Sequence, residues 1–91
     1  MEFEFDPAKS ASNLAKHGID FLEAKQLWAD KFAAVVDARS DSEPRTALIA
    51  QNKGNVWIAF FTEQQGKTRL ISVRRARVNE ERIYYEGTGT R

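Results

Sequence analysis

The chain has 91 residues, of which 42% are hydrophobic, 30% are charged and none is cysteine. A chain this short predicts a single domain over residues 1–91, with one modest core and little room for an enclosed substrate cavity. The composition excludes disulfide scaffolds, thiolate metal sites and cysteine nucleophiles, and the net charge of +1 points by itself to no particular partner.

The chain begins with a predicted short strand over residues 2–5, where polar and apolar side chains alternate. Its acidic start lacks the basic and apolar regions of a signal peptide. The longest apolar run, residues 56–61, is too short to cross a bilayer. We therefore expect a cytoplasmic protein that has no membrane partner.

A first helix is predicted to begin after Asp6, an N-cap acceptor, with Pro7 in the first helical position. The helix should end at Gly18, which adopts left-handed backbone conformations without a Cβ clash. Apolar residues that recur at helical spacing form its predicted buried side, namely Ala8, Ala11, Leu14 and Ala15.

A second helix is predicted over roughly residues 21–29. Asp20 and Glu23 have the spacing of a capping box, in which the first side chain accepts from the backbone N–H three residues later. The predicted buried residues of this helix are Phe21, Ala24, Leu27 and Trp28.

Strands dominate the rest of the chain. They are predicted over residues 32–38, 46–51, 56–62 and 69–75, with tight turns at 52–55 and 64–67. The segment 56–62 is apolar on both faces, which favours a central position in the sheet. Asn79 is the predicted cap of a short C-terminal helix, with Ile83 and either Tyr84 or Tyr85 on its buried side.

This order of elements favours an α+β fold. Helices come early and hairpin-linked strands come later, which differs from the alternation of a parallel βαβ sheet. We expect an antiparallel sheet with the two N-terminal helices packed on one face and the other face partly open.

The lone histidine, His17, is the first candidate site residue. Histidine is the side chain that exchanges protons most readily near neutral pH, and His17 lies beside Lys16 at the predicted end of a helix. One histidine excludes a histidine-rich metal site within the chain, and no metal spacing or glycine-rich phosphate loop is present, so we expect no metal and no cofactor. The alternative is a histidine that only helps to satisfy the last carbonyls of its helix.

Basic side chains concentrate in the second half of the chain. Residues 1–44 carry five basic and nine acidic side chains, a net of −4, and residues 45–91 carry nine basic and four acidic side chains, a net of +5. Such asymmetry indicates an anionic partner, although a solvated, salt-bridged surface would account for the same charges.

The last predicted strand carries the most concentrated positive charge. Because side chains alternate along a strand, Ile71 and Val73 should point into the core and Arg74 to the open face. Arg69 and Arg75 share the core-facing parity but lie at the strand ends, where long side chains reach around. Arginine suits phosphate because its planar fork donates two hydrogen bonds and keeps its charge. The alternative is a strand face kept soluble by charge.

In their order along the chain, these residues resemble the BrnT family of toxins. The resemblance covers nearly the whole chain, and the Asn-x-x-Lys-His-Gly block at residues 13–18 is its most specific part. Its other elements are Phe3–Asp6, Lys9, Ile19, Phe21, Glu23, Ala24, Arg45, residues 69–76, Glu81 and Tyr84 or Tyr85. Phe5 and Val73 depart from the family, where tryptophan and alanine are common.

The resemblance implies a RelE-like fold and a toxin of a type II toxin–antitoxin system that cuts RNA and arrests growth. It also implies a BrnA-like antitoxin with a ribbon-helix-helix domain, and a complex that binds operator DNA and represses its own operon. Carried over by position, the active-site candidates are His17, Arg45, Arg69, Arg74 and Arg75, with Lys16 in support.

These residues suit RNA cleavage without metal, because the ribose 2′-OH is an internal nucleophile. We expect His17 to transfer protons while Arg69 and Arg74 grip the scissile phosphate. The residues expected to bind RNA around them are Lys16, Arg45, Arg75 and Arg77. Two alternatives stay open: a nucleic-acid or protein interaction module without catalytic activity, and a degenerate toxin that acts only in promoter autoregulation.

Overall fold

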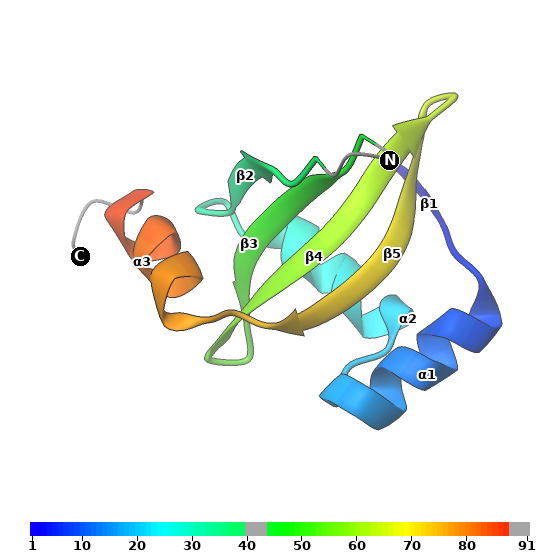
Figure 1. Cartoon of the computed structure of the whole chain (residues 1–91), viewed down its shortest axis with the longest axis horizontal. Coiled ribbons are helices and arrows are strands. Elements are labelled where there is room, and N and C mark those ends of the chain that lie inside the picture. Colours follow the sequence, from blue (N-terminus) through cyan, green and yellow to red (C-terminus); the bar gives the residue numbers. More distant parts are fainter. Residues whose placement is uncertain (40–43, 88–91) are drawn as a thin grey trace.

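The computed structural model describes residues 1–39 and 44–87, in which helices flank a five-stranded sheet (Figure 1). In chain order the elements are β1 (Glu2–Glu4), α1 (Pro7–His17), α2 (Phe21–Ala24), the 3-10 helix η1 (Lys25–Ala29), β2 (Ala34–Asp37), β3 (Thr46–Asn52), β4 (Asn55–Gln64), β5 (Lys67–Arg75) and α3 (Val78–Gly87). The predictions of an α+β fold and of a C-terminal helix are confirmed.

The strands lie in the order β1-β5-β4-β3-β2. Two tight hairpins join β3 to β4 and β4 to β5, and both central residues of each turn have positive φ. The angles are 52° at Lys53 and 83° at Gly54 in the first turn, and 52° at Gln65 and 80° at Gly66 in the second. Such turns match the right-handed twist of the flanking strands. The predicted central position of residues 56–62 is confirmed, because β4 lies in the middle of the sheet.

The pairing of β1 contradicts the prediction of an antiparallel sheet. β1 pairs with β5 in parallel, with Phe3 opposite Thr68 and Glu4 opposite Arg69. Hairpins make their two strands antiparallel, whereas most of the chain separates β1 from β5, so no short connection fixes their relative direction. The described sheet is therefore mixed, with its parallel pair at the β1 edge.

One face of the sheet carries the larger core, under α2 and η1. These helices insert Phe21, Ala24 and Leu27, as predicted for the second helical segment. Trp28 packs edge-on against Phe61 of β4, with 5.2 Å between the ring centroids. The strands complete this core with Leu48, Ala50, Trp57, Ala59, Phe61, Leu70 and Val73.

The opposite face carries a smaller core under α3. Because side chains alternate along a strand, β3 and β4 present a separate set of residues here, namely Ala47, Ile49, Val56 and Ile58. Tyr84 packs against them and is buried, whereas Ile83 and Tyr85 are exposed. α3 begins at Val78, one residue before the predicted cap Asn79.

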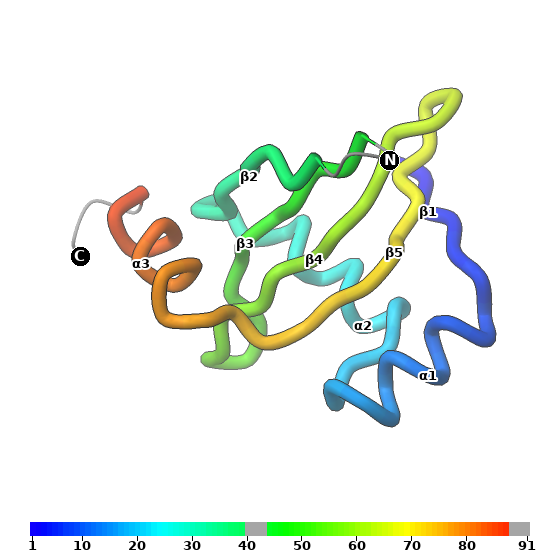
Figure 2. Tube along the Cα trace, in the orientation of Figure 1, coloured from blue at the N-terminus to red at the C-terminus, as the bar shows by residue number. Residues whose placement is uncertain are grey.

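The packing of α1 is the clearest correction to the sequence analysis. The four apolar residues predicted as its buried side are all exposed, namely Ala8, Ala11, Leu14 and Ala15. Its buried residues are Ser10 and Asn13. α1 lies alongside β5 (Figure 2), and Asn13 hydrogen-bonds the backbone of that strand. Backbone N–H and C=O groups require polar partners when they are buried, so the helix buries its polar side.

Candidate active site

The end of α1 places two basic side chains at the surface. Asp6 caps the start of the helix by accepting a hydrogen bond of 2.9 Å from the N–H of Ala8. Gly18 ends it in the left-handed conformation (φ 80°) and donates its N–H to the carbonyl of Leu14. Lys16 and His17 therefore lie in the last helical turn, where cations suit the helix dipole, and both are exposed.

Two buried polar side chains fix this helix in place. The Asn13 amide nitrogen donates to the carbonyl of Val73 at 2.9 Å and to that of Ile19 at 2.8 Å. Its amide oxygen accepts from the N–H of Val73 at 3.1 Å, so Asn13 bonds β5 as a neighbouring strand would. The Ser10 hydroxyl accepts from the N–H of Phe21 at 2.9 Å and ties α1 to α2.

A hollow of about 270 Å³ lies between α1 and β5, which we call the first hollow. Its lining residues are Lys9, Ser12, Asn13, Lys16, His17, Ile71 and Ser72. The Asn13 hydrogen bonds thus hold α1 against β5 so that Lys9, Lys16 and His17 line one open cavity.

A β-bulge shapes the opposite wall of this hollow. The pairing of β4 with β5 shifts between Phe60, opposite Ser72, and Phe61, opposite Leu70, so Ile71 is the extra residue. Leu70 and Val73 both point into the larger core, and Ile71 belongs to neither core. The prediction that Ile71 points into the core is therefore wrong, because a bulge adds one residue to the alternation.

The bulge also changes the face on which Arg69 lies. It precedes the core residue Leu70 and so faces the same side of the sheet as Arg74, contrary to the predicted core-facing parity. Arg69 lines a second hollow of about 150 Å³ together with Lys9, Arg45, Thr62, Gln64 and Ile71. Its guanidinium lies 3.8 Å from Glu4 of β1 and is 41% exposed.

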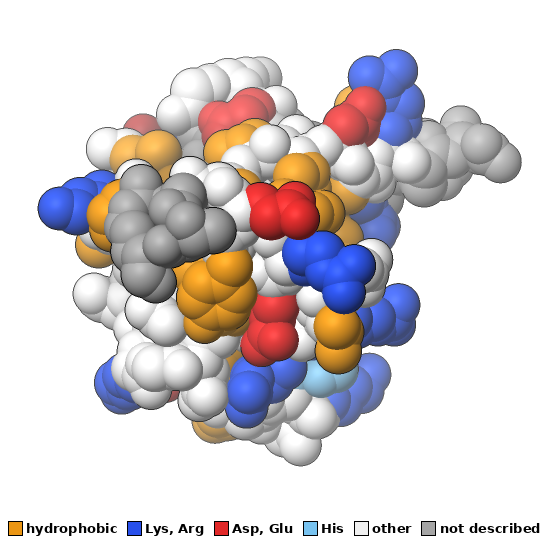
Figure 3. Space-filling model, turned by 90° about the vertical axis from the view of Figure 1, so that its left-hand side faces the viewer, with side chains coloured by type: hydrophobic (Ala, Val, Ile, Leu, Met, Phe, Trp, Pro, Cys, Tyr) orange, Lys and Arg blue, Asp and Glu red, His pale blue; other side chains and the backbone are white. Residues whose placement is uncertain are grey.

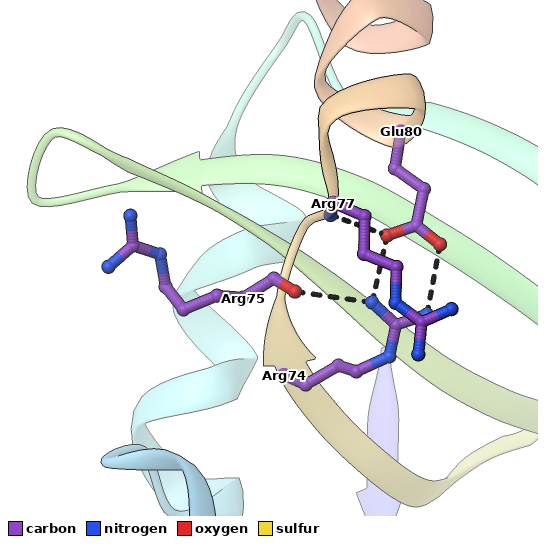
Figure 4. A network of polar contacts seen from close by, with 4 residues as sticks. All are labelled: Arg74, Arg75, Arg77 and Glu80. Atoms are coloured by element: carbon purple, nitrogen blue, oxygen red, sulfur yellow. Dashed lines mark hydrogen bonds and ion pairs between the residues drawn. The ribbon is translucent and has the colours of Figure 1, made fainter.

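Arg74 has a different environment at the junction of β5 with α3 (Figure 4). Its two terminal nitrogens donate to the two carboxylate oxygens of Glu80, at 2.8 and 2.9 Å. It also donates to the carbonyl of Arg75 and lies over the ring of Phe60, 5.4 Å from the centroid. This guanidinium attaches α3 to the sheet.

The other two arginines of this region, Arg75 and Arg77, line neither hollow. The backbone N–H of Arg77 donates to Glu80 at 2.8 Å, a contact that satisfies a free donor at the start of α3. Arg75 points away from Arg74, Arg77 and Glu80 (Figure 4) and lies over Trp57, 5.6 Å from the ring centroid.

The seven predicted site residues thus fall into three sets. His17 and Lys16 line the first hollow, and Arg45 and Arg69 line the second. Arg74 and Arg77 lie at the start of α3, and the side chain of Arg75 points away from them. The space-filling view shows the histidine, in pale blue, at the surface beside side chains of lysine or arginine (Figure 3).

Comparison with known proteins identifies the family. One family model matches residues 5–80, and the family is described as the ribonuclease toxin BrnT of type II toxin–antitoxin systems. The chain belongs to the BrnT family. No curated protein matches it. The resemblance noted in the sequence is therefore confirmed.

Lys9 is a site residue of this BrnT-family chain that was not among the predicted ones. It lines both hollows, together with Ile71. The signal was present in the sequence, because Lys9, Asn13 and Lys16 are spaced four and three residues apart and so share one side of a helix.

α3 is attached to the fold by two carboxylates with lowered pKa. The hydrogen bonds from Arg74 hold the pKa of Glu80 below its usual value, against the opposing effect of burial. Burial raises the pKa of Asp30, but hydrogen bonds from Tyr84, Gln51 and Phe32 outweigh this effect and lower it overall.

Tyr84 of α3 contacts one of these carboxylates, Asp30. Its hydroxyl donates to Asp30 at 2.6 Å. Burial and this acceptor raise the pKa of Tyr84 to about 12, so the hydroxyl keeps its proton at physiological pH.

No group of three or more histidine, aspartate or glutamate side chains within residues 1–39 and 44–87 is arranged to hold a metal ion. In the same part of the chain, no helix is long and apolar enough to span a membrane.

Proposed function

We propose that this BrnT-family chain is a metal-independent endoribonuclease, and that the first hollow is its catalytic site. The observation that carries the proposal is the convergence of His17, Lys9 and Lys16 on one open cavity. An open, basic surface suits a polymeric anion better than a small metabolite.

The chemistry uses the ribose 2′-OH as the nucleophile. His17 accepts the proton of that hydroxyl while its oxygen attacks the adjacent phosphorus, and the bond to the 5′ oxygen breaks. The leaving 5′ oxygen takes up a proton from water, and the products are a 2′,3′-cyclic phosphate and a 5′-hydroxyl end. Lys9 and Lys16 stabilise the extra negative charge of the transition state.

The arginines around this cavity draw RNA to the surface. Arg45 and Arg69 act from the neighbouring hollow, and Arg75 and Arg77 add positive potential at the far end of β5. Arg74 can grip a phosphate only by exchanging its bidentate contact with Glu80 for one with the substrate. We therefore assign the scissile phosphate to the lysines of the first hollow. The Arg74→Ala variant tests whether Arg74 also contacts this phosphate.

The test is RNA cleavage by purified protein with EDTA present. His17→Ala should lower the cleavage rate at least a hundredfold, the usual contribution of a general base. Arg82→Gln is the control, because Arg82 is an exposed residue of α3 that lines neither hollow. A substrate with 2′-deoxyribose at the cleavage position should stay intact.

Growth provides the second readout. Expressed without antitoxin, the parent chain should stop translation and growth, and His17→Ala should not. If His17→Ala and Arg74→Ala both arrest growth and degrade RNA as the parent does, the site assignment is wrong. If the parent binds RNA but never shortens it, the chain is an interaction module and not an enzyme.

We also propose the biological setting that the family implies. The chain acts in the cytoplasm, with a RelE-like fold, and a BrnA-like ribbon-helix-helix antitoxin neutralises it. An acidic or amphipathic antitoxin segment would match the basic first hollow. The complex would repress its own operon, which a gel-shift assay with the operator DNA tests. A neighbouring gene for a ribbon-helix-helix protein is the simplest check of this setting.

A further inference from the structure

The two hollows are neighbours on one surface. Lys9 of α1 and Ile71 of the β-bulge line both of them. The first hollow extends from there along α1 to His17, and the second extends across β5 and β4 to Arg45. A ligand that fills the first hollow therefore borders the second.

The second hollow is built from three adjacent strands. Arg69 of β5 pairs with Thr62 of β4, and Arg45 directly precedes Thr46, which pairs with Phe61. Neighbouring strands lie about 4.8 Å apart, so Arg45 and Arg69 face each other across Thr62 with roughly 10 Å between their backbones. The long side chain of Arg69 can reach a small anion placed over the threonine, and Arg45 adds positive charge on the far side.

The polar character of the second hollow fits such an anion. Of its six lining residues among those described, three are cations and none is acidic. Thr62 and Gln64 add neutral hydrogen-bond donors. The Arg69 guanidinium lies 3.8 Å from Glu4, which exceeds hydrogen-bond distance. The Arg69 fork is thus held only weakly by protein groups.

We propose that the second hollow is a subsite for the phosphate next to the scissile one in the same RNA strand. The inference rests on the proposed function, since it takes the first hollow as the cleavage site. A phosphate matches the bidentate fork of Arg69 and accepts further hydrogen bonds from the neutral donors around it.

Lys9 and Ile71 explain why the two phosphates belong to one strand. Lys9 borders both hollows, so its ammonium lies between the two phosphates and contacts either. Ile71 separates the two sites with an apolar side chain, which suits the uncharged sugar or base between consecutive phosphates. The site thus selects a single strand with at least two phosphates.

The experiment compares binding of small ligands that cannot be cleaved. The probes are 2′-O-methyl dinucleosides of mixed base sequence with one internal phosphate, and the same dinucleosides with an added 5′ or 3′ terminal phosphate. For the parent chain, one of the two added phosphates should tighten binding about fivefold at low salt, the upper range for an exposed ion pair. Arg69→Gln and Lys9→Gln should each remove most of this gain.

Two further variants guard against misfolding and general charge effects. Glu4→Gln removes the carboxylate that competes for Arg69, so it should increase the gain from the added phosphate. Arg82→Gln makes the same charge change as Arg69→Gln outside both hollows and should keep the parental gain. A parent chain that binds all three probes equally, or a gain that persists in both Arg69→Gln and Lys9→Gln, would overturn the proposal.

The outcome can be separated from that of the proposed function. His17→Ala should keep the gain from the added phosphate while losing cleavage. A gain that depends on Arg69, in a chain that never cleaves RNA, would reject the catalytic proposal and keep the second subsite as a phosphate-binding site. Cleavage that depends on His17 without any gain would reject the subsite alone.

Discussion

The two helices that attach to β5 do so by opposite means. α1 attaches through the neutral amide of Asn13, which bonds the backbone of Val73. α3 attaches through the ion pair of Arg74 with Glu80, whose side chains are only 23% and 14% exposed. The first attachment uses no charged group, and the second uses a guanidinium and a carboxylate.

This difference decides which cations can meet a ligand. Around α1, Lys9, Lys16 and His17 make no ion pair with the described residues and line an open hollow. Around α3, the guanidinium of Arg74 already has a bidentate carboxylate. Cations of the two regions therefore differ in their availability to a ligand, and the difference follows from how the neighbouring helix is attached to β5.

The largest expected effect is the loss of stability when the Asn13 amide, which attaches α1 to β5, is removed. Asn13→Ala leaves the buried N–H and C=O groups of Val73 and the carbonyl of Ile19 without their partner. We expect the free energy of unfolding to fall by about 3 kcal/mol, since unsatisfied buried polar groups cost about 1–3 kcal/mol each. Chemical denaturation measures this change, with Asn79→Ala on exposed α3 surface as the control. A loss below roughly 1 kcal/mol would show that water replaces the amide.

Removal of the ion pair that attaches α3 to β5 should lower the unfolding free energy somewhat less. Arg74→Gln removes a bidentate partner from the partly buried Glu80, and we expect a loss of about 2 kcal/mol. In a double-mutant cycle with Glu80→Gln, the two losses should be far from additive. Additive losses would mean that the two side chains stabilise the fold independently of each other.

In contrast to Arg74, Arg69 should affect RNA cleavage more than stability. Because its contact with Glu4 is long and exposed, Arg69→Gln should leave the unfolding free energy within about 0.5 kcal/mol of the parent. RNA cleavage at limiting substrate should fall about fivefold, and the fall should shrink as salt screens the charge. Equal effects of Arg69→Gln and Arg74→Gln on both stability and cleavage would contradict the view that Arg69 is available to RNA while Arg74 serves the fold.

The smallest expected effect is a dependence on acid pH. The folded state lowers the pKa of Glu80 and of Asp30, so each stabilises the protein above its unfolded pKa, 4.5 and 3.8, and this contribution is lost as pH falls through the folded values. The denaturant concentration at the midpoint of unfolding should therefore decrease when the pH is lower than about 4.5. Glu80→Gln should show a smaller drop. A drop equal to that of the parent would assign the effect to other carboxylates.

Local rules predicted the parts of the fold that depend on neighbouring residues. Asp6 and Gly18 bound α1 where capping requires, and Gly54 and Gly66 lie in the hairpin turns. The central position of β4 followed from its two apolar faces. Each of these features depends on contacts within a few residues or on the composition of one segment.

The errors arose where one segment meets a distant one. The apolar side of α1 was predicted to be buried, but the helix meets a strand edge and needs Asn13 there. Nothing local indicates a bulge at Ile71, which reversed the predicted face of Arg69. The partner of Arg74, Glu80, lies in the next element, so the alternation of side chains along β5 alone predicted an unpaired Arg74.

The amide of Asn13 has one more consequence, for association between molecules. An unpaired strand edge is a template on which another chain can add a strand. β1 covers β5 at Lys67, Thr68 and Arg69, and Asn13 occupies both hydrogen-bonding groups of Val73, so an incoming strand finds few free groups along this border. The opposite border is β2, only four residues long. Intermolecular strand addition, and aggregation that begins with it, is thereby directed to β2.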